Sequence, residues 1–307
     1  MMTDIPTRPL TAAIVMVCAM LIIGVIDNVI PLLASEIGLW QFHFVRAFMA
    51  VPLVLSLSLF GLGTVWPVRL WAVALRSVLI AVSMMFYFTA LAILPIAQAL
   101  AGLFTSPIFI LLITAIFLRT SVGPWRYFAV VIGFAGILCV LQPDPVNFDW
   151  RILLPVAGGF FYALSAMATR SLCAGESTVA LLLGMWLTLW AMGAVGLVLL
   201  GLWPQEAAPG PDGFFWRGWV WPMWESTPWV IVQVIGSVSG VFLIIKAYQL
   251  GEPSYVAVFE YSVMIFGPVF ALLAFGHPIG PWQIGGIALI IVAGAIIALR
   301  SSKDVQT

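Results

Sequence analysis

Ten long apolar runs follow one another along this chain of 307 residues. Each run has about 20 residues, the length that an α-helix needs to cross the roughly 30 Å hydrocarbon core of a bilayer. The predicted spans are residues 10–33, 38–60, 69–92, 96–118, 122–141, 150–172, 178–203, 228–249, 253–276 and 279–299. The runs are continuously apolar instead of alternating between apolar and polar residues. The sequence therefore predicts membrane-spanning helices, not the strands of a barrel.

The low content of charged residues supports a membrane location. Only 8% of the residues are charged and 63% are hydrophobic, whereas soluble domains have about 25% charged residues. The net charge is zero and no basic patch is present, so we expect no nucleic-acid partner. The prediction is an all-α, multi-pass integral protein of a plasma membrane, the inner membrane in a bacterium, which contacts the lipid bilayer.

Positive charges predict the orientation of the spans. With a cytoplasmic N-terminus, only Arg151 and Arg217 fall outside, and eight other basic residues fall at cytoplasmic span ends. These eight are Arg8, Arg69, Arg119, Arg126, Arg170, Lys246, Arg300 and Lys303. Both termini are therefore expected in the cytoplasm. The longest loop, 204–227, is then external, and its tryptophans predict a segment that lies at the membrane interface.

The two halves of the sequence resemble each other. An offset of 157 residues takes Ala90 to Ala247 and the triplet at 123–125, Gly-Pro-Trp, to the same triplet at 280–282. The matches fall at equivalent spans, so we predict a first five-helix repeat over residues 1–145 and a second over 146–307. Because five is odd, the second repeat enters the membrane upside down. Inverted repeats are typical of secondary transporters.

Ten helices in two inverted halves resemble the drug/metabolite transporter superfamily, specifically its EamA-domain proteins. The segment ALAILPIAQALAGLFTSPIF at 90–109 is similar to that family's signature of the third and fourth spans. Gly133-x-x-Gly136 is similar to its fifth span, and Arg46 to an arginine early in its second span. The chain departs from the family pattern at one position. Many members have a glutamate just after the fourth span, where this chain has Arg119-Thr120.

This resemblance implies a secondary transporter that works by alternating access at a central cavity between the repeats. It implies first an exporter of aromatic or neutral amino acids, as in the YddG-like branch of amino-acid exporters. The alternative is an importer of a cationic or nucleoside-like metabolite such as S-adenosylmethionine. An intramembrane enzyme is a remote alternative, since the sequence contains no HExxH or GxSxG motif and no cluster of His and Asp. The lack of a repeated filter makes a channel less favoured.

Ionisable side chains inside the spans are candidates for function, because inserting one costs about 2.5–3.5 kcal/mol. Asp27, His43 and Arg46 are candidates for proton coupling or gating. Asp27 either binds a proton or a substrate amine, or forms an ion pair with Arg46 that locks the first two spans together. His43 lies one turn from Arg46 on the same helix face.

Two further ionisable residues are candidates for substrate binding. Arg76 either extends to the cytoplasmic interface or binds a substrate carboxylate. Gln233 occupies the repeat-equivalent position, which favours a cavity-facing role for both. Glu260 has no basic neighbour in the sequence and could pair with Lys246 or Arg76.

Uncharged side chains complete the predicted site, because ligand sites are mostly apolar with a few placed polar groups. The remaining substrate-binding candidates are Tyr87, Gln98, Phe104, Tyr162, Ser237 and Tyr261. Each could instead pack against a neighbouring helix. Pro107 and Pro268 predict kinks that could act as gating hinges, and glycines at 158–159, 236, 240 and 285–286 predict close helix contacts. We expect a monomer with a small-molecule substrate, and no catalytic residue, metal or cofactor.

Overall fold

The computed structural model describes residues 8–116, 124–142, 149–251 and 253–304, and its regular elements are all helices. The α-helices are α1 (Pro9–Asp27), α2 (Ile30–Glu36), α3 (Leu39–Leu59), α4 (Leu70–Ile93), α5 (Ile96–Leu103), α6 (Ser106–Ile116), α7 (Pro124–Leu141), α8 (Leu153–Ser171), α9 (Thr178–Leu202), α10 (Thr227–Leu250), α11 (Pro253–Glu260), α12 (Val263–Phe275) and α13 (Pro281–Asp304). Two short 3₁₀ helices, η1 (Trp150–Ile152) and η2 (Gly210–Gly213), precede α8 and interrupt the long loop.

Within the described residues, six helical stretches are long and apolar enough to cross a membrane. Four shorter apolar helices, Ile96–Ile110, Tyr127–Leu141, Val263–Phe275 and Pro281–Ile296, fall on the remaining predicted spans. The predicted all-α fold is therefore confirmed. The departure Arg119-Thr120 lies outside the described residues.

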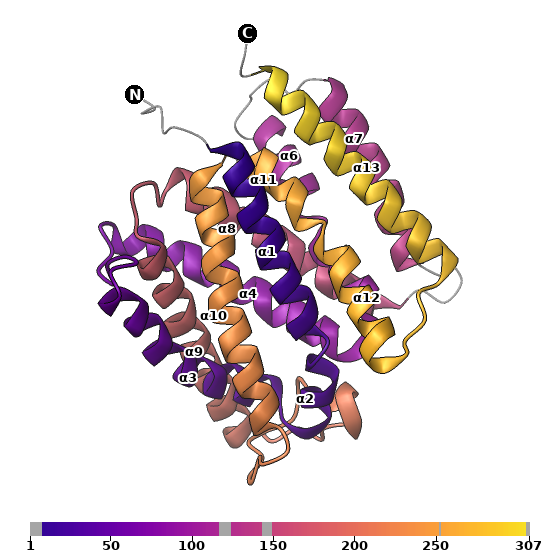
Figure 1. Cartoon of the computed structure of the whole chain (residues 1–307). Helices are drawn as coiled ribbons and strands as arrows, with labels where there is room; N and C mark the ends of the chain where they lie inside the picture. Colours follow the sequence, from indigo (N-terminus) through magenta and orange to yellow (C-terminus); the bar gives the residue numbers. More distant parts are fainter. Residues whose placement is uncertain (1–7, 117–123, 143–148, 252, 305–307) are drawn as a thin grey trace.

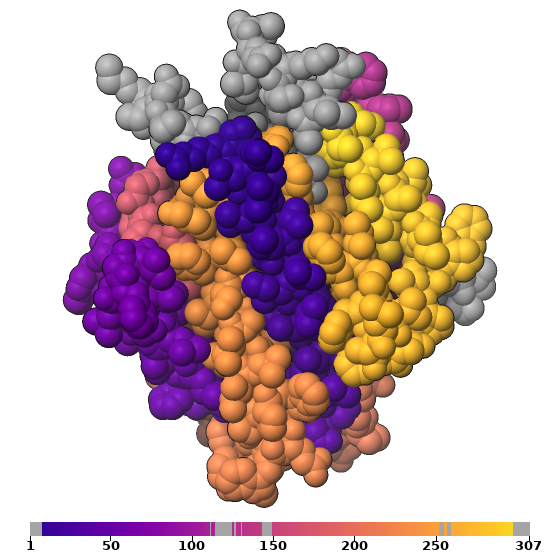
Figure 2. Space-filling view, in the orientation of Figure 1, coloured from indigo at the N-terminus to yellow at the C-terminus, as the bar shows by residue number. Residues whose placement is uncertain are grey.

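Helices of the first half pack mainly against helices of the second half. The most extensive contacts are α13 with α7, α3 with α9, α4 with α8 and α1 with α10. Figure 1 shows α1 beside α10, and α7 beside α13 on one flank, with the start of α1 and the end of α13 at the same end of the molecule. The space-filling view shows α1 embedded between α10 and α12 (Figure 2). The centre of the protein is thus built from both halves.

Both halves contain a broken helix, at positions 157 residues apart. α5 ends at Leu103 and α6 begins at Ser106, whereas α11 ends at Glu260 and α12 begins at Val263. At the first break the Thr105 hydroxyl donates to the Gly102 carbonyl at 2.7 Å. At the second break the Ser262 hydroxyl donates to the Phe259 carbonyl, also at 2.7 Å. Discontinuous helices of this kind surround the substrate sites of many secondary transporters.

The first break changes the role expected of one proline. Pro107 lies in the first turn of α6, after the break at Phe104 and Thr105, so it begins this helix instead of kinking it. Pro268 does lie inside α12, as the sequence predicted.

Most of the predicted glycines lie where helices approach closely. A Cβ on Gly286 of α13 would lie 2.5 Å from the Gly136 carbonyl oxygen of α7, and a Cβ on Gly159 would lie 2.6 Å from the Leu103 carbonyl oxygen. A Cβ on Gly236 or on Gly240 would likewise lie too close to isoleucine side chains of α1. Gly285 is the exception, because nothing lies within 4 Å of its Cβ position.

The long loop after α9 is fixed to the end of the molecule opposite the start of α1 (Figure 1). Arg217 donates to the carbonyl oxygens of Ala34, Ile37 and Gly210. Gln41 and Val220 exchange two hydrogen bonds of 2.8 Å. Exposed tryptophans of the loop, Trp216, Trp219, Trp221 and Trp224, form its outer surface. Such indoles suit the predicted position at the membrane interface.

Candidate functional site

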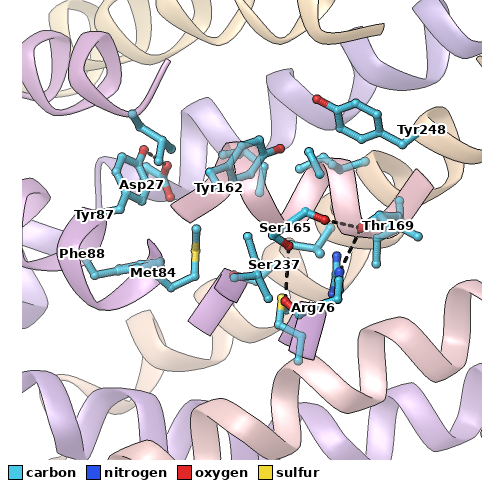
Figure 3. Close-up of a pocket in the computed structure, with 18 of the residues that line it drawn as sticks. Asp27, Arg76, Met84, Tyr87, Phe88, Tyr162, Ser165, Thr169, Ser237 and Tyr248 are labelled. Atoms are coloured by element: carbon cyan, nitrogen blue, oxygen red, sulfur yellow. Dashed lines mark hydrogen bonds between the residues drawn. The ribbon is translucent and has the colours of Figure 1, made fainter. Parts of the chain in front are cut away.

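A cavity lies between the two halves (Figure 3). Side chains of α1, α3, α4, α8, α9 and α10 and the end of α5 line it. Because each half contributes to the walls, movement between the halves would change its access.

One wall of the cavity is a stripe of side chains on α4. Arg76, Ile80, Met84, Tyr87 and Phe88 recur every three or four residues, so they share one helix face. Together with Trp186 of α9 and Phe104 at the end of α5, this face makes the lining mainly apolar and aromatic.

Arg46 of α3 is held by aromatic rings instead of a carboxylate. Its guanidinium carbon lies 4.5 Å from the ring centre of Phe42, 4.4 Å from that of Phe88 and 5.1 Å from that of Trp186. A cation near ring faces gains about 0.5–2 kcal/mol per contact, depending on desolvation. The rings therefore stabilise a charge that is only 2% exposed.

Hydrogen bonds orient the Arg46 guanidinium across the interface with α10. Its Nη1 donates to Gln233 Oε1 at 3.1 Å and lies 3.5 Å from Ser237 Oγ. Gln233 in turn donates to the Ile26 carbonyl of α1 at 2.6 Å. His43 Nδ1 lies 3.3 Å from Arg46 Nη2, on the shared face that the sequence predicted. This network ties α1, α3 and α10 together.

Asp27 ends α1 at one side of the cavity, where Tyr87 donates a hydrogen bond to its Oδ2 at 2.5 Å (Figure 3). Among the described residues the only ion pairs within 4.0 Å are those of Arg151 with Asp149 and Asp212. The predicted ion pair between Asp27 and Arg46 is therefore absent, because Gln233 and the aromatic rings hold the guanidinium instead.

Arg76 faces the interior and does not extend to the interface. It is 5% exposed. Its Nε donates to Thr169 Oγ1 at 3.1 Å, and its Nη1 donates to the Leu181 carbonyl at 3.2 Å. Figure 3 shows Arg76 and Thr169 on the side of the cavity away from Asp27. The cavity is thus bordered by two buried guanidinium groups.

Glu260 lies behind the cavity wall and is fully buried. Its Oε1 atom accepts hydrogen bonds from Tyr162 at 2.7 Å and from Tyr248 at 2.8 Å. The predicted pairing with Lys246 or Arg76 is absent within the described part of the chain, and Lys246 is exposed. Two tyrosines that line the cavity therefore replace the expected cation.

The predicted candidates divide into three groups. The lining contains Asp27, Arg46, Arg76, Tyr87, Phe104, Tyr162 and Ser237. A second layer, in contact with lining residues, contains His43, Gln233, Glu260 and Tyr261. Outside the lining lie Gln98, Pro107 and Pro268. Gln98 instead donates to the Leu141 carbonyl of α7 at 3.0 Å.

Several lining residues were missed by the sequence analysis. Phe88, Trp186 and Tyr248 are common aromatic residues of apolar helices and carry no distinguishing signal. Ser165 and Thr169 did carry one, because they follow Tyr162 at three and seven residues and so form a polar stripe on α8.

Residues 10–142 match the EamA-like transporter family. A riboflavin transporter of Rhizobium johnstonii is 27% identical over 299 residues, which cover 95% of this chain and 92% of that protein. A riboflavin transporter of Vibrio cholerae is 27% identical, with 98% and 97% covered. An S-adenosylmethionine uptake transporter of Rickettsia bellii is 22% identical, with 87% and 84% covered.

A solved crystal structure has the same fold. Its chain superposes with a TM-score of 0.69 at 17% sequence identity, over 95% of this chain and 98% of that chain. The agreement extends over both halves.

Proposed function

We propose that this protein carries flat heteroaromatic metabolites of the riboflavin class. It is a multi-pass membrane protein, and its residues 10–142 match the EamA-like transporter family. The chain is a secondary transporter of small metabolites and not an enzyme. The proposal of riboflavin as substrate is more specific than this role, and it is argued from the residues that line the cavity.

The composition of the cavity wall is the observation that carries the proposal. A broad apolar and aromatic lining borders two buried guanidinium groups, Arg46 and Arg76. A flavin has a planar ring system that can stack on Phe88 or Trp186. Its carbonyl oxygens are acceptors that match guanidinium donors. The similarity to proteins named riboflavin transporters supports the same substrate class.

Two other substrate classes fit the cavity less well. S-adenosylmethionine is cationic, and a single lining carboxylate, Asp27, faces two lining arginines among the described residues. Export of aromatic or neutral amino acids would use Arg76 for the substrate carboxylate. However, none of the relatives named above is an amino-acid exporter.

Transport into proteoliposomes tests the proposal. Purified protein in vesicles preloaded with unlabelled riboflavin should accumulate labelled riboflavin by exchange, and added S-adenosylmethionine or phenylalanine should not compete. Saturable exchange of either competitor without riboflavin exchange would reject the proposal.

A matched pair of tryptophan variants locates the site. Trp186 lines the cavity, whereas Trp190 lies one turn later on α9, is 40% exposed and stacks on Phe44. Trp186→Ala should weaken riboflavin binding by about tenfold, which corresponds to roughly 1.4 kcal/mol of lost stacking. Trp190→Ala should change it by less than about twofold. Equal effects of the two variants would place the substrate elsewhere.

A further inference from the structure

The Glu260 carboxyl has an arrangement that transport of a neutral substrate does not by itself require. One oxygen, Oε1, lies within hydrogen-bond distance of two tyrosine hydroxyls. The other oxygen, Oε2, is buried and has no partner among the residues that the structure describes. Burying a carboxylate with so few donors is costly, because a charge in a low-dielectric site needs a cation or several hydrogen bonds.

Among the described residues, the surroundings of Glu260 contain hydroxyls and no cation. α11 packs against α1, α6, α8, α10 and α13. The titratable groups that face the carboxyl are Tyr162 of α8 and Tyr248 of α10, with Tyr261 next to it in the chain. On α1 the titratable residues are Asp27, which bonds to Tyr87, and Cys18, which is exposed. The described side chains of α6 and α13 include no titratable group.

The position of Glu260 also favours a neutral carboxyl. Arg76, the lining cation on α4, is engaged by Thr169 and the Leu181 carbonyl and forms no ion pair with Glu260. A proton is therefore the simplest ligand that removes the buried negative charge.

The two tyrosine contacts are compatible with either protonation state, because hydroxyl hydrogens can turn. When Glu260 is ionised, both hydroxyls donate to Oε1 and offer only lone pairs to the cavity. When Oε1 carries a proton, it donates to one tyrosine oxygen while the other tyrosine still donates to it. The first tyrosine then has its own O–H free to donate into the cavity, which both tyrosines line.

We propose that Glu260 is a proton-binding site of the transport cavity, and that its protonation converts one of Tyr162 and Tyr248 from an acceptor into a donor toward the substrate. This inference rests on the proposed use of the cavity for substrate. A substrate rich in carbonyl acceptors then binds best to the protonated protein. By thermodynamic linkage, bound substrate strengthens proton binding by the same factor, so the two move together.

Infrared spectroscopy tests the proton site without any substrate. A pH-difference spectrum of the purified protein should contain the C=O stretch of a protonated carboxylic acid that disappears at alkaline pH. Glu260→Gln should remove this band, and Tyr162→Phe or Tyr248→Phe should shift it, because each removes one hydrogen bond. Asp27→Asn, which removes the buried carboxyl that lines the cavity, should leave the band in place. Persistence of the whole signal in Glu260→Gln would overturn the proposal.

Binding measurements test the link to the substrate. Riboflavin should bind the wild-type protein more weakly as pH rises, whereas Glu260→Gln, which stays neutral and keeps a donor, should bind with the same affinity at every pH. The double variant Tyr162→Phe/Tyr248→Phe should also lose the pH dependence. A pH dependence that survives in both variants would overturn the switch. Absence of riboflavin binding at every pH rejects the proposed substrate and the linkage to it, and the infrared result then decides the proton site by itself.

Discussion

Arg46 shows how a buried charge can be held without an acidic partner. Three aromatic rings surround the guanidinium, and Gln233 accepts a hydrogen bond from it. The planar guanidinium can stack on rings and donate in its own plane at the same time, which an ammonium group cannot do. The geometry therefore requires arginine and not merely a positive charge.

Arg46→Lys should destabilise the protein although it keeps the charge. Ring contacts of about 0.5–2 kcal/mol each and a charged hydrogen bond of about 1.5–3 kcal/mol are weakened, so we expect a loss of roughly 2–4 kcal/mol. A lower midpoint of thermal unfolding in detergent would reveal it. Arg151→Lys is the control, because this side chain is about half exposed and its ion pairs lie at the surface. Equal midpoints for the two variants would contradict the role assigned to the rings.

The sequence identified the buried ionisable residues correctly, but it did not identify their hydrogen-bond partners. Membrane burial makes every ionisable residue conspicuous, and Asp27, Arg46, Arg76 and Glu260 were found by that rule. Their partners are neutral groups of other helices, such as Tyr87 for Asp27, 60 residues away in the chain. Opposite charge was the only pairing signal available, and the ion pairs that it offered as alternatives for Asp27 and Glu260 are replaced in the structure by tyrosine hydroxyls.

At the scale of the helices, close packing depends on individual glycines. Gly285 and Gly286 are neighbours on α13 but face different surroundings. Gly286 lies against the Gly136 backbone of α7, whereas nothing lies near the Cβ position of Gly285. The sequence predicted both as contact glycines, because composition does not tell which side of a helix faces its partner.

This neighbouring pair provides a controlled experiment. Gly286→Ala should push α7 and α13 apart, since the added Cβ would lie 2.5 Å from a carbonyl oxygen. Gly285→Ala should be neutral or stabilise the helix by up to about 1 kcal/mol, because alanine is the better helix former. Size-exclusion chromatography after heating would compare the two. A Gly286→Ala variant as heat-resistant as Gly285→Ala would contradict the observed contact.

The helix limits were largely predictable, but the breaks were not. The predicted span 69–92 is α4, Leu70–Ile93, and the predicted span 178–203 is α9, Thr178–Leu202. Apolar length fixes such limits because the bilayer sets them. The breaks at residues 104–105 and 261–262 lie inside predicted spans, where apolar length sets no boundary. Hydroxyls at equivalent positions, Thr105 and Ser262, are a signal that the two breaks share.

For the whole molecule, the orientation in the membrane remains a prediction from the positive charges. The loop that contains Asp212 should face the exterior, and the loop that contains Thr64, between α3 and α4, should face the cytoplasm. Both side chains are exposed. Cysteines at these positions, in a variant with Cys18, Cys139 and Cys173 replaced by alanine, should differ in labelling. A membrane-impermeant maleimide should reach position 212 in intact cells and position 64 only after the cells are opened. The reverse pattern would invert the topology.

The paired breaks in the two halves have a consequence for the direction of transport. Each break has the same hydroxyl-to-carbonyl bond at the same distance. Because both bonds are made in the same structure, an exchange of conformations between the halves would leave their number unchanged. These two bonds therefore favour neither side of the membrane. In the proposed transport, the gradient of the substrate, together with that of the proton proposed to bind Glu260, would then set the direction of flow.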